Sequence, residues 1–249
     1  MSFEKMLNHT TIREFTKDVV SKEIIEVLKQ AANRAASSTG MQQSSIIRVK
    51  DQEKRKALAK IGGQEYLARV PELWIFIVDT FRNNQILKEK TKSSLDKIDM
   101  DKFFQGFTDG VIQAQQVVTA AESLGLGTVF FGCILNDYEK TIEVLNLPKG
   151  TFPIVGLGFG YPNQKPQIKP RMKMDLKFFE DEYKIETNYL EKIKDYDQEM
   201  QTYYDTRDQG RRSDCFSDQV VKKSLNIVGK RDLVVRSIVS QGFDLSLDD

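Results

Sequence analysis

The stretch Leu73-Trp-Ile-Phe-Ile-Val78 is an unbroken apolar run, rich in β-branched and aromatic residues. A strand with one face in water alternates apolar and polar residues, whereas a strand covered on both faces is apolar throughout. We therefore expect a central strand over 73–78. Three further strand-like runs lie between segments of helical spacing, at roughly 45–49, 128–132 and 153–159. This alternation predicts an α+β or α/β domain of three layers.

The clearest helical pattern covers 104–123. At a rise of roughly 1.5 Å per residue, such a helix is long enough to cross a domain. Its apolar residues recur at intervals of three and four, the spacing of one helix face, and are Phe104, Phe107, Val111, Ala114, Val118 and Ala121. Shorter helices are expected over 21–36, 51–60 and 136–145, with Ser21 and Asn136 as caps of the first and last.

Composition excludes several classes of function. The 249 residues include 37 Lys+Arg and 36 Asp+Glu, a net charge of +1, which argues against a nucleic-acid or membrane-surface binder. His9 is the single histidine, so a zinc site of two or three histidines is impossible. Two cysteines, Cys133 and Cys215, are too few for a disulfide framework and fit a reducing, cytoplasmic compartment. We expect no membrane span, no metal site, and neither a Rossmann fingerprint nor a P-loop.

From residue 163 the chain becomes polar, charged and poor in aliphatic residues. Helices are expected near 189–205, 217–225 and 231–241. Such a segment has little core of its own. We therefore expect it to lie against the main domain or against another subunit.

A first candidate binding segment is His9-Thr-Thr-Ile-Arg13. Side chains alternate in an extended chain, so His9, Thr11 and Arg13 would share one side while Ile12 points inward. An imidazole, a hydroxyl and a guanidinium in a row suit a phosphate and a polar ring edge. The alternative is a helix cap followed by a surface arginine.

Three further stretches are polar or basic. The loop Ser37 to Ser45 is rich in hydroxyl and amide groups that suit a bound ligand, or it is simply a polar loop. Lys169 and Arg171 flank a proline and suit a phosphate, or they are a solvated basic pair. Arg207, Arg211 and Arg212 form a basic loop that suits an anionic ligand, or they are solvated surface.

The order of these motifs resembles a known family. Asn8-His-Thr-Thr-Ile-Arg-Glu-Phe15 resembles the N-terminal signature H-R-S-I-R-x-F of the FMN-dependent nitroreductases. Further similar segments, typical of the branch of oxygen-insensitive NADPH nitroreductases and flavin reductase P, are Gln42–Ile47, Gly62–Gln64, Ala120–Gly127, Gly158–Pro162, Lys169–Arg171 and the tail from Tyr203 to Asp218. The resemblance runs from roughly residue 5 to 230.

The resemblance implies an α+β, three-layer nitroreductase-like fold. A central, mostly antiparallel sheet would be flanked by helices, with one long central helix. The chain 1–249 would form a single domain, with 163–249 as a polar, largely helical C-terminal extension. It also implies a homodimer with FMN at the subunit interface, in which this extension wraps the partner.

The resemblance further implies a noncovalent FMN site. His9, Thr11 and Arg171 would hold the phosphate, beside Lys169, and Arg13 would lie near the flavin N1/O2 edge. The remaining cofactor contacts would come from Thr10, Ser37, Ser38, Gln42, Gln64, Phe130, Phe131, Gly132 and Cys133. NADPH or substrate would contact Thr39, Arg207, Arg211 and Arg212. No side chain is expected to be catalytic, because the flavin N5 performs hydride transfer.

Three positions depart from the family pattern. Thr10 stands where the signature often has arginine, and Thr39 where serine is frequent. Cys133 stands where glycine is common, and its side chain is expected to crowd the flavin's surroundings. These departures leave enough cations for FMN binding but affect affinity and substrate range.

The implied function is two-electron transfer from NADPH or NADH, by a ping-pong mechanism, to nitroaromatic, quinone or related acceptors. One alternative is an NAD(P)H:flavin oxidoreductase that reduces free FMN or FAD. Another is a non-catalytic FMN-binding protein on the same fold, and a third is a cofactor-free α+β interaction protein. For each of these functions we expect a cytoplasmic protein without a nucleic-acid or membrane partner.

Overall fold

The computed structural model describes residues 3–95, 97–205 and 211–245, and it divides into two compact units. The first unit comprises Met1–Leu7, Thr11–Gln164 and Val228–Asp249. The second comprises Asn8–Thr10 and Lys165–Ile227. The C-terminal residues therefore return to the first unit. The single-domain description remains a prediction.

The first unit is built on a four-stranded sheet in the order β1-β2-β5-β4, whose neighbouring strands are all antiparallel. Its strands are β1 (Ser44–Arg48), β2 (Glu72–Asp79), β5 (Thr151–Gly160) and β4 (Gly127–Phe131). Every residue of β2 before Asp79 is buried, so the predicted central strand is confirmed. The predicted mostly antiparallel sheet is confirmed as well.

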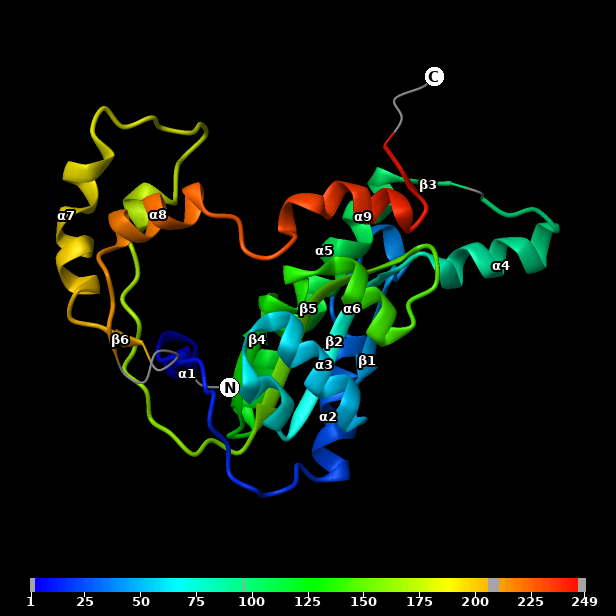
Figure 1. Ribbon diagram of the computed structural model, residues 1–249, viewed down its shortest axis with the longest axis horizontal. Coiled ribbons are helices and arrows are strands. Elements are labelled where there is room, and N and C mark those ends of the chain that lie inside the picture. The colour runs from blue at the N-terminus through cyan, green and yellow to red at the C-terminus, as the bar shows by residue number, and fades with distance from the viewer. Residues whose placement is uncertain (1–2, 96, 206–210, 246–249) are drawn as a thin grey trace. The chain divides into compact units, whose positions relative to one another are not determined.

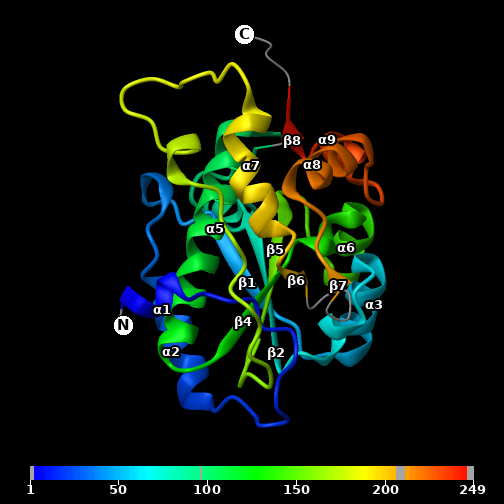
Figure 2. The same cartoon turned by 90° about the vertical axis from the view of Figure 1, so that its left-hand side faces the viewer.

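Alternate residues of β2 enter two different hydrophobic clusters. Trp74, Phe76 and Val78 pack with residues of α2 (Lys22–Asn33) and α5 (Met100–Ser123). Leu73, Ile75 and Ile77 pack instead with a layer made of α3 (Gln52–Gly62), η2 (Glu65–Arg69), η3 (Gly132–Asn136) and α6 (Tyr138–Leu145). Figures 1 and 2 show the two groups of helices on opposite faces of the sheet. The predicted three layers are therefore present, and the unbroken apolar run is explained by burial on both sides.

The long helix α5 corrects one prediction. The spacing predicts one apolar face that includes Phe104 and Val111, yet these two residues are 62% and 45% exposed. The buried face includes Gly106 and Gly110, where an added Cβ would lie 2.5 Å from the Gln43 carbonyl oxygen and 2.2 Å from Ile154. These glycines let α5 approach β1 and the loop before it closely. Counting apolar side chains does not detect them, because glycine has none.

Helix caps explain where two of the shorter helices begin. Ser21 caps α2 as predicted, because its hydroxyl accepts a bond from Ile24 N. The cap of α6 is Asp137 and not Asn136, since the Asp137 carboxylate accepts from Lys140 N at 3.1 Å. Asn136 instead ends η3.

The first unit is completed by short elements at its periphery, namely α1 (Phe3–Leu7), η1 (Ser38–Gly40), α4 (Phe81–Thr91), β3 (Ile98–Asp99), η6 (Arg231–Leu233), α9 (Val234–Ser240) and β8 (Phe243–Asp244). β3 and β8 pair in parallel. The returning C-terminus is tied to the core because the Phe243 ring lies 4.9 Å from that of Phe103, edge to face. The helix expected over 231–241 is thus a 3-10 turn followed by α9.

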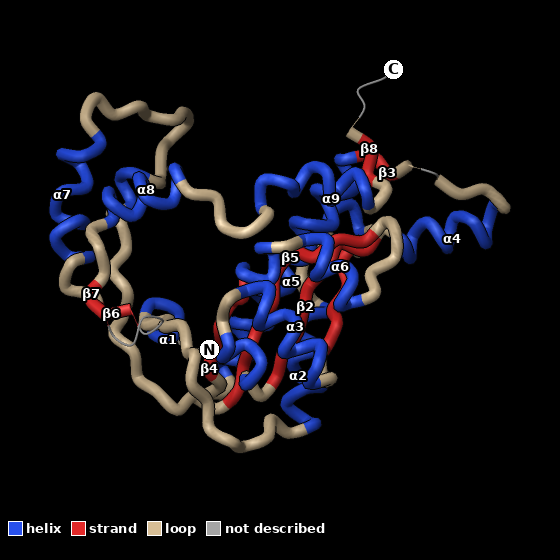
Figure 3. Tube along the Cα trace, viewed as in Figure 1, coloured by secondary structure: helices blue, strands red, loops and turns tan. Residues whose placement is uncertain are grey.

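The second unit contains η4 (Met174–Leu176), α7 (Tyr189–Met200), the strand pair β6 (Tyr204–Asp205) and β7 (Arg211–Arg212), and α8 (Phe216–Leu225). The two helices are joined where Ser217 donates to the Asp197 carboxylate from both its backbone N, at 2.9 Å, and its hydroxyl, at 2.6 Å. Long loops precede η4 and join it to α7 (Figure 3). The helix predicted near 189–205 ends earlier, at Met200. None of the helices in the described ranges is long and apolar enough to cross a membrane.

Candidate functional site

The predicted site residues are divided between the two units. His9, Thr10, Lys169, Arg171, Arg211 and Arg212 belong to the second unit. The first unit holds Thr11, Arg13, Ser37, Ser38, Thr39, Gln42, Gln64, Phe130, Phe131, Gly132 and Cys133. Each group is described within its own unit.

The segment around Ile12 is extended, as predicted. Thr11 forms a parallel bridge with Thr128, and Ile12 N donates to the Thr128 carbonyl oxygen at 2.8 Å. The Ile12 side chain is buried against Gly127, where an added Cβ would lie 2.6 Å from Ile12 Cγ1. Thr11 and Ile12 are thus held beside β4 by strand-like pairing.

The loop before β1 has an unusual backbone. Thr39, Gly40 and Gln42 have φ values of 50°, 72° and 52°, in the left-handed region that L side chains rarely adopt. The side chains of Thr39 and Gln42 are exposed, and those of Ser37 and Ser38 are partly so. The loop thus presents hydroxyl and amide groups on a backbone that does not follow the ordinary preferences of its residues.

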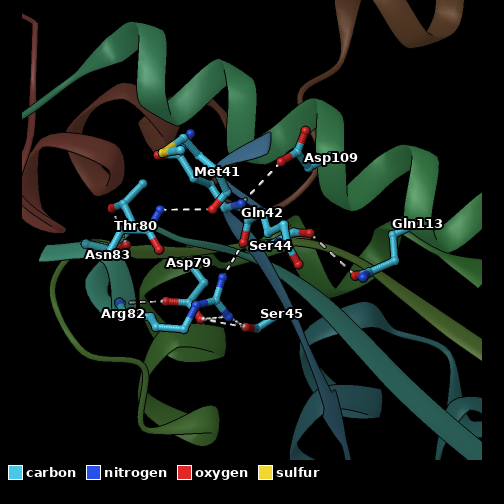
Figure 4. A network of polar contacts seen from close by, with 12 residues as sticks. Met41, Gln42, Ser44, Ser45, Asp79, Thr80, Arg82, Asn83, Asp109 and Gln113 are labelled. Atoms are coloured by element: carbon cyan, nitrogen blue, oxygen red, sulfur yellow. Dashed lines mark hydrogen bonds and ion pairs between the residues drawn. The ribbon is translucent and has the colours of Figure 1, made fainter. Parts of the chain in front are cut away.

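Polar side chains from other elements hold this loop, one of them buried and one exposed (Figure 4). Asp109 of α5 accepts from Ser38 N at 2.6 Å and from Gln43 N at 3.2 Å. On another side, Arg82 of α4 donates to the Gln42 carbonyl oxygen. A polar cavity of about 120 Å³ lies beside the loop, and its lining includes Asn33, Ser37, Gln42, Ser44, Arg82, Asp109 and Gln113.

Sequence reasoning missed Asp109 and Arg82. A signal for Asp109 existed, since an acid at an inward position of the long helix stands beside Gly110 and three residues after Gly106. An ionisable residue is rarely buried without a partner. Arg82 carried no comparable signal, because its role depends on how the start of α4 meets the loop.

Cys133 and Gln64 lie together beside α3. The Cys133 thiol donates to Gln64 Oε1 at 3.4 Å, and the Tyr66 hydroxyl donates to the same oxygen at 2.7 Å. The sulfur occupies the space left by Gly62, where an added Cβ would lie 2.6 Å from it. Burial raises the pKa of the Cys133 thiol. This side chain is therefore a neutral group packed against α3.

The end of β4 combines a buried ring, an exposed ring and open space. Phe131 is fully buried, whereas its neighbour Phe130 is 42% exposed, because successive side chains of a strand point to opposite faces. An added Cβ on Gly132 would meet no atom within 4 Å. Arg231, a residue that sequence reasoning missed, donates to the Gly132 carbonyl oxygen and, at 2.9 Å, to Asn136 Oδ1. The backbone at Gly132 is therefore held by Arg231 and has open space beside it.

The basic pair of the second unit is held less tightly. Arg171 is exposed, and its guanidinium donates to the carbonyl oxygens of Lys169 at 3.0 Å and Pro170 at 3.2 Å. The Lys169 ammonium lies 5.7 Å from the centre of the Tyr203 ring, within the range of a cation–π contact. These contacts of the two cations lie within the second unit.

The predicted NADPH arginines are described only in part. Arg207 lies outside the described residues. The backbone of Arg211 and Arg212 pairs with β6, while their side chains are not described. Their proposed role therefore rests on sequence.

Two family models match this chain. The model of the nitroreductase family matches residues 6–161, and that of its C-terminal domain matches residues 169–246. The chain belongs to the nitroreductase family. The match supports the resemblance inferred from the order of the motifs.

The chain is similar to bacterial reductases over most of its length. An oxygen-insensitive NADPH nitroreductase of Salmonella typhimurium is 34% identical, over 97% of this chain and 98% of the relative. An FMN reductase (NADPH) of Bacillus subtilis is 32% identical, over 88% of this chain and 90% of the relative.

Solved structures show the same fold. The NADPH:FMN oxidoreductase from Vibrio harveyi, complexed with NAD+, has a TM-score of 0.86 and 32% identity, covering 98% of both chains. Nitroreductase A from Vibrio parahaemolyticus also has a TM-score of 0.86 and 32% identity, covering 98% of this chain and 97% of that one. The predicted nitroreductase-like fold class is confirmed.

Proposed function

We propose that this chain is an FMN-dependent NAD(P)H oxidoreductase that passes two electrons to nitroaromatic, quinone or related acceptors. The observation that carries this proposal is the match to the nitroreductase family over almost the whole chain, with relatives named as NADPH nitroreductases and FMN reductases. We expect a ping-pong cycle, because NAD(P)H and the acceptor would use the same bound cofactor in turn.

The donor groups of the first unit fit a flavin. Ser37, Ser38 and Gln42 offer partly or fully exposed hydroxyl and amide groups, which suit a ribityl chain and polar ring edges. Gln64 is held in place because its Oε1 accepts hydrogen bonds from the Tyr66 hydroxyl and the Cys133 thiol. The open space at Gly132 suits a ring that approaches the backbone, flanked by Phe130, Phe131 and Cys133.

The second unit supplies the charge that a phosphate requires. Lys169 and Arg171 are cations, and His9 and Thr10 belong to the same unit. Guanidinium and hydroxyl groups form strong hydrogen bonds to phosphate oxygens. We propose that His9, Thr11 and Arg171 hold the phosphate, with Lys169 beside it and Thr10 as a further cofactor contact.

Bound FMN supplies the hydride chemistry, and the protein's contribution is binding, orientation and electrostatics. Arg13 would stabilise negative charge at the N1/O2 edge, since a guanidinium stays charged in proteins. Cys133 is not proposed as a nucleophile, because burial raises the pKa of its thiol. Among the described residues, no group of three or more His, Cys, Asp or Glu is placed to hold a metal ion.

We propose that the donor nucleotide contacts Thr39, Arg207, Arg211 and Arg212. The three arginines lie within six positions of one another in the sequence, and their charge suits the 2′-phosphate of NADPH. This assignment favours NADPH over NADH.

We propose a cytoplasmic homodimer with FMN at the subunit interface. Phe104, Val111 and Ile112 of α5 are exposed, and so are Phe3 and Leu7 of α1. Large exposed apolar side chains on neighbouring elements favour association, and a second copy of the chain would cover them. Light scattering after size-exclusion chromatography tests the dimer, and a monomer would contradict it.

The test of the proposed function is anaerobic mixing of the FMN-loaded protein with NADPH. We expect the visible flavin band to bleach and then to return when a nitroaromatic or a quinone is added. A band that does not bleach supports the non-catalytic FMN-binding alternative, and purified protein without a flavin spectrum supports a cofactor-free protein.

A second candidate, reduction of free flavin, is favoured by the name of the Bacillus subtilis relative. Rates with a nitroaromatic, a quinone and free FMN under identical conditions separate the two. Faster reduction of free FMN than of both other acceptors would make this chain a flavin reductase.

A further inference from the structure

The loop Ser37–Gln43 keeps a backbone conformation that its residues do not favour. Thr39 and Gln42 carry side chains at positive φ, on either side of Gly40 and Met41. Non-glycine residues persist in this region only where the surrounding structure fixes them. The loop therefore requires a partner that holds it.

Asp109 is that partner at both ends of the loop. It lies inside α5 and is 2% exposed. One carboxylate oxygen accepts from Ser38 N at 2.6 Å, and the other accepts from Gln43 N at 3.2 Å. Because an ionised carboxylate has two acceptor oxygens and no donor, a single side chain satisfies two backbone donors on opposite sides of the turn.

The helix is shaped to bring this carboxylate to the loop. Gly106 stands three residues before Asp109, and an added Cβ there would lie 2.5 Å from the Gln43 carbonyl oxygen. Any larger residue would push the loop away from α5. The close approach of α5 to the loop is therefore what allows the two hydrogen bonds to Asp109.

A second group of contacts holds the tip of the loop from α4. Arg82 donates to the Gln42 carbonyl oxygen and, at 3.1 Å, to the Ser45 hydroxyl. Asn83 donates to the Met41 carbonyl oxygen at 3.0 Å. Figure 4 shows Asp109 and Arg82 reaching the loop from different elements.

We propose that Asp109 is a positioning residue for the flavin site. It fixes the loop so that Ser37, Ser38 and Gln42 are oriented before FMN arrives. This inference rests on the proposed function, since those three residues are proposed cofactor contacts. A loop ordered in advance loses less conformational entropy when the ligand binds, so the effect of Asp109 falls on FMN affinity. Asp109 itself would not touch the cofactor.

The test uses Asp109→Asn in the full-length protein. Asparagine has the same shape but only one acceptor oxygen, so one of the two backbone N–H groups loses its partner. We expect the Kd for FMN of the apoprotein to rise about 10-fold, and the amides of 37–43 to exchange with deuterium about 10-fold faster. At saturating FMN, the rate of reduction by NADPH should stay within about threefold of wild type.

Two further variants keep the test interpretable. Val118→Ala removes packing from the same helix without touching the loop, so it should lower the Tm and leave FMN affinity and loop exchange unchanged. Arg82→Gln changes a partly exposed residue, which makes misfolding a minor concern. It should raise the Kd for FMN and the exchange rate of the amides of 37–43, as Asp109→Asn does, but by a smaller factor.

Unchanged loop exchange in Asp109→Asn and Arg82→Gln would overturn the positioning role. Faster exchange with unchanged FMN affinity would also overturn it, because the loop would then be held for another reason. Equal losses in Val118→Ala would assign the effect to general stability. Wild-type protein that binds no FMN would contradict the proposed function instead, and the wild-type titration reveals this separately.

Discussion

The Ser37–Gln43 loop and the Lys169–Arg171 segment present two different kinds of binding group. The loop offers neutral hydroxyls and amides, and buried Asp109 bonds to its backbone at both ends. The segment offers cations, and the exposed Arg171 donates to the neighbouring carbonyl oxygens of Lys169 and Pro170. Hydrogen bonds between neutral groups demand precise geometry, whereas charge attraction weakens more gradually with distance. We therefore expect the hydroxyl and amide groups of the loop to depend on supporting contacts more than the cations of Lys169–Arg171 do.

The largest expected effect tests the cations of Lys169–Arg171. Arg171→Ala should weaken FMN retention by roughly 10- to 100-fold, because a hydrogen bond to a charged group contributes about 1.5–3 kcal/mol. A fluorescence titration of the apoprotein with FMN measures this. Lys192→Ala removes an exposed cation of the same unit that pairs with Glu186, and it should change little. Unchanged affinity in Arg171→Ala would remove Arg171 from the phosphate site.

The next largest effect is expected where α5 approaches the loop Ser37–Gln43. Gly106→Ala places a Cβ 2.5 Å from the Gln43 carbonyl oxygen, so it should displace the loop and destabilise the fold by about 1–3 kcal/mol. Urea unfolding and an FMN titration measure the two consequences. Gln115→Ala, an exposed substitution on the same helix, should be neutral within about 0.5 kcal/mol. If Gly106→Ala binds FMN as wild type does, the loop does not need its close approach to α5.

A smaller effect concerns cations of the segment after α7. Arg207→Ala or Arg211→Ala should raise the KM for NADPH up to about 10-fold, and that for NADH much less, because only NADPH carries the 2′-phosphate. Steady-state kinetics with both donors measures the difference. Equal increases for NADPH and NADH would exclude the 2′-phosphate role.

The smallest expected effect is a pH dependence of folding stability that is caused by the Cys133 thiol. Burial raises the folded-state pKa of the Cys133 thiol above its unfolded value. The thiol therefore favours folding below the unfolded pKa, about 8.5, and this contribution is lost as the pH rises through the folded pKa. Urea unfolding at neutral and alkaline pH should show a smaller alkaline loss in Cys133→Ala than in wild type. An equal loss would show that the thiol does not titrate with unfolding.

Much of the fold was predictable because burial leaves a pattern in the residues. The run 73–78 predicted β2, and the spacing over 104–123 predicted α5. The same spacing misplaced Phe104 and Val111, because glycines at the buried face carry no apolar side chain to count. The element against which one face of a helix packs depends on the tertiary structure.

The candidate site shows the same division. The motifs around His9, Ser37 and Lys169 marked polar groups of the kinds that bind a phosphate and a flavin, and their order indicated the family. Nothing in those motifs identified Arg82, Arg231 or the way Asp109 bonds to a loop about 70 residues away in the sequence. Such contacts depend on elements that meet only after the chain has folded.

Residue types and their local spacing were enough to predict the central strand, the long helix and the family, and composition excluded a histidine metal site. The positive-φ loop, the burial of Asp109 and the packing of Cys133 against Gly62 depend on the folded arrangement. A strained backbone and a buried carboxylate exist only where distant groups supply hydrogen bonds and exclude water.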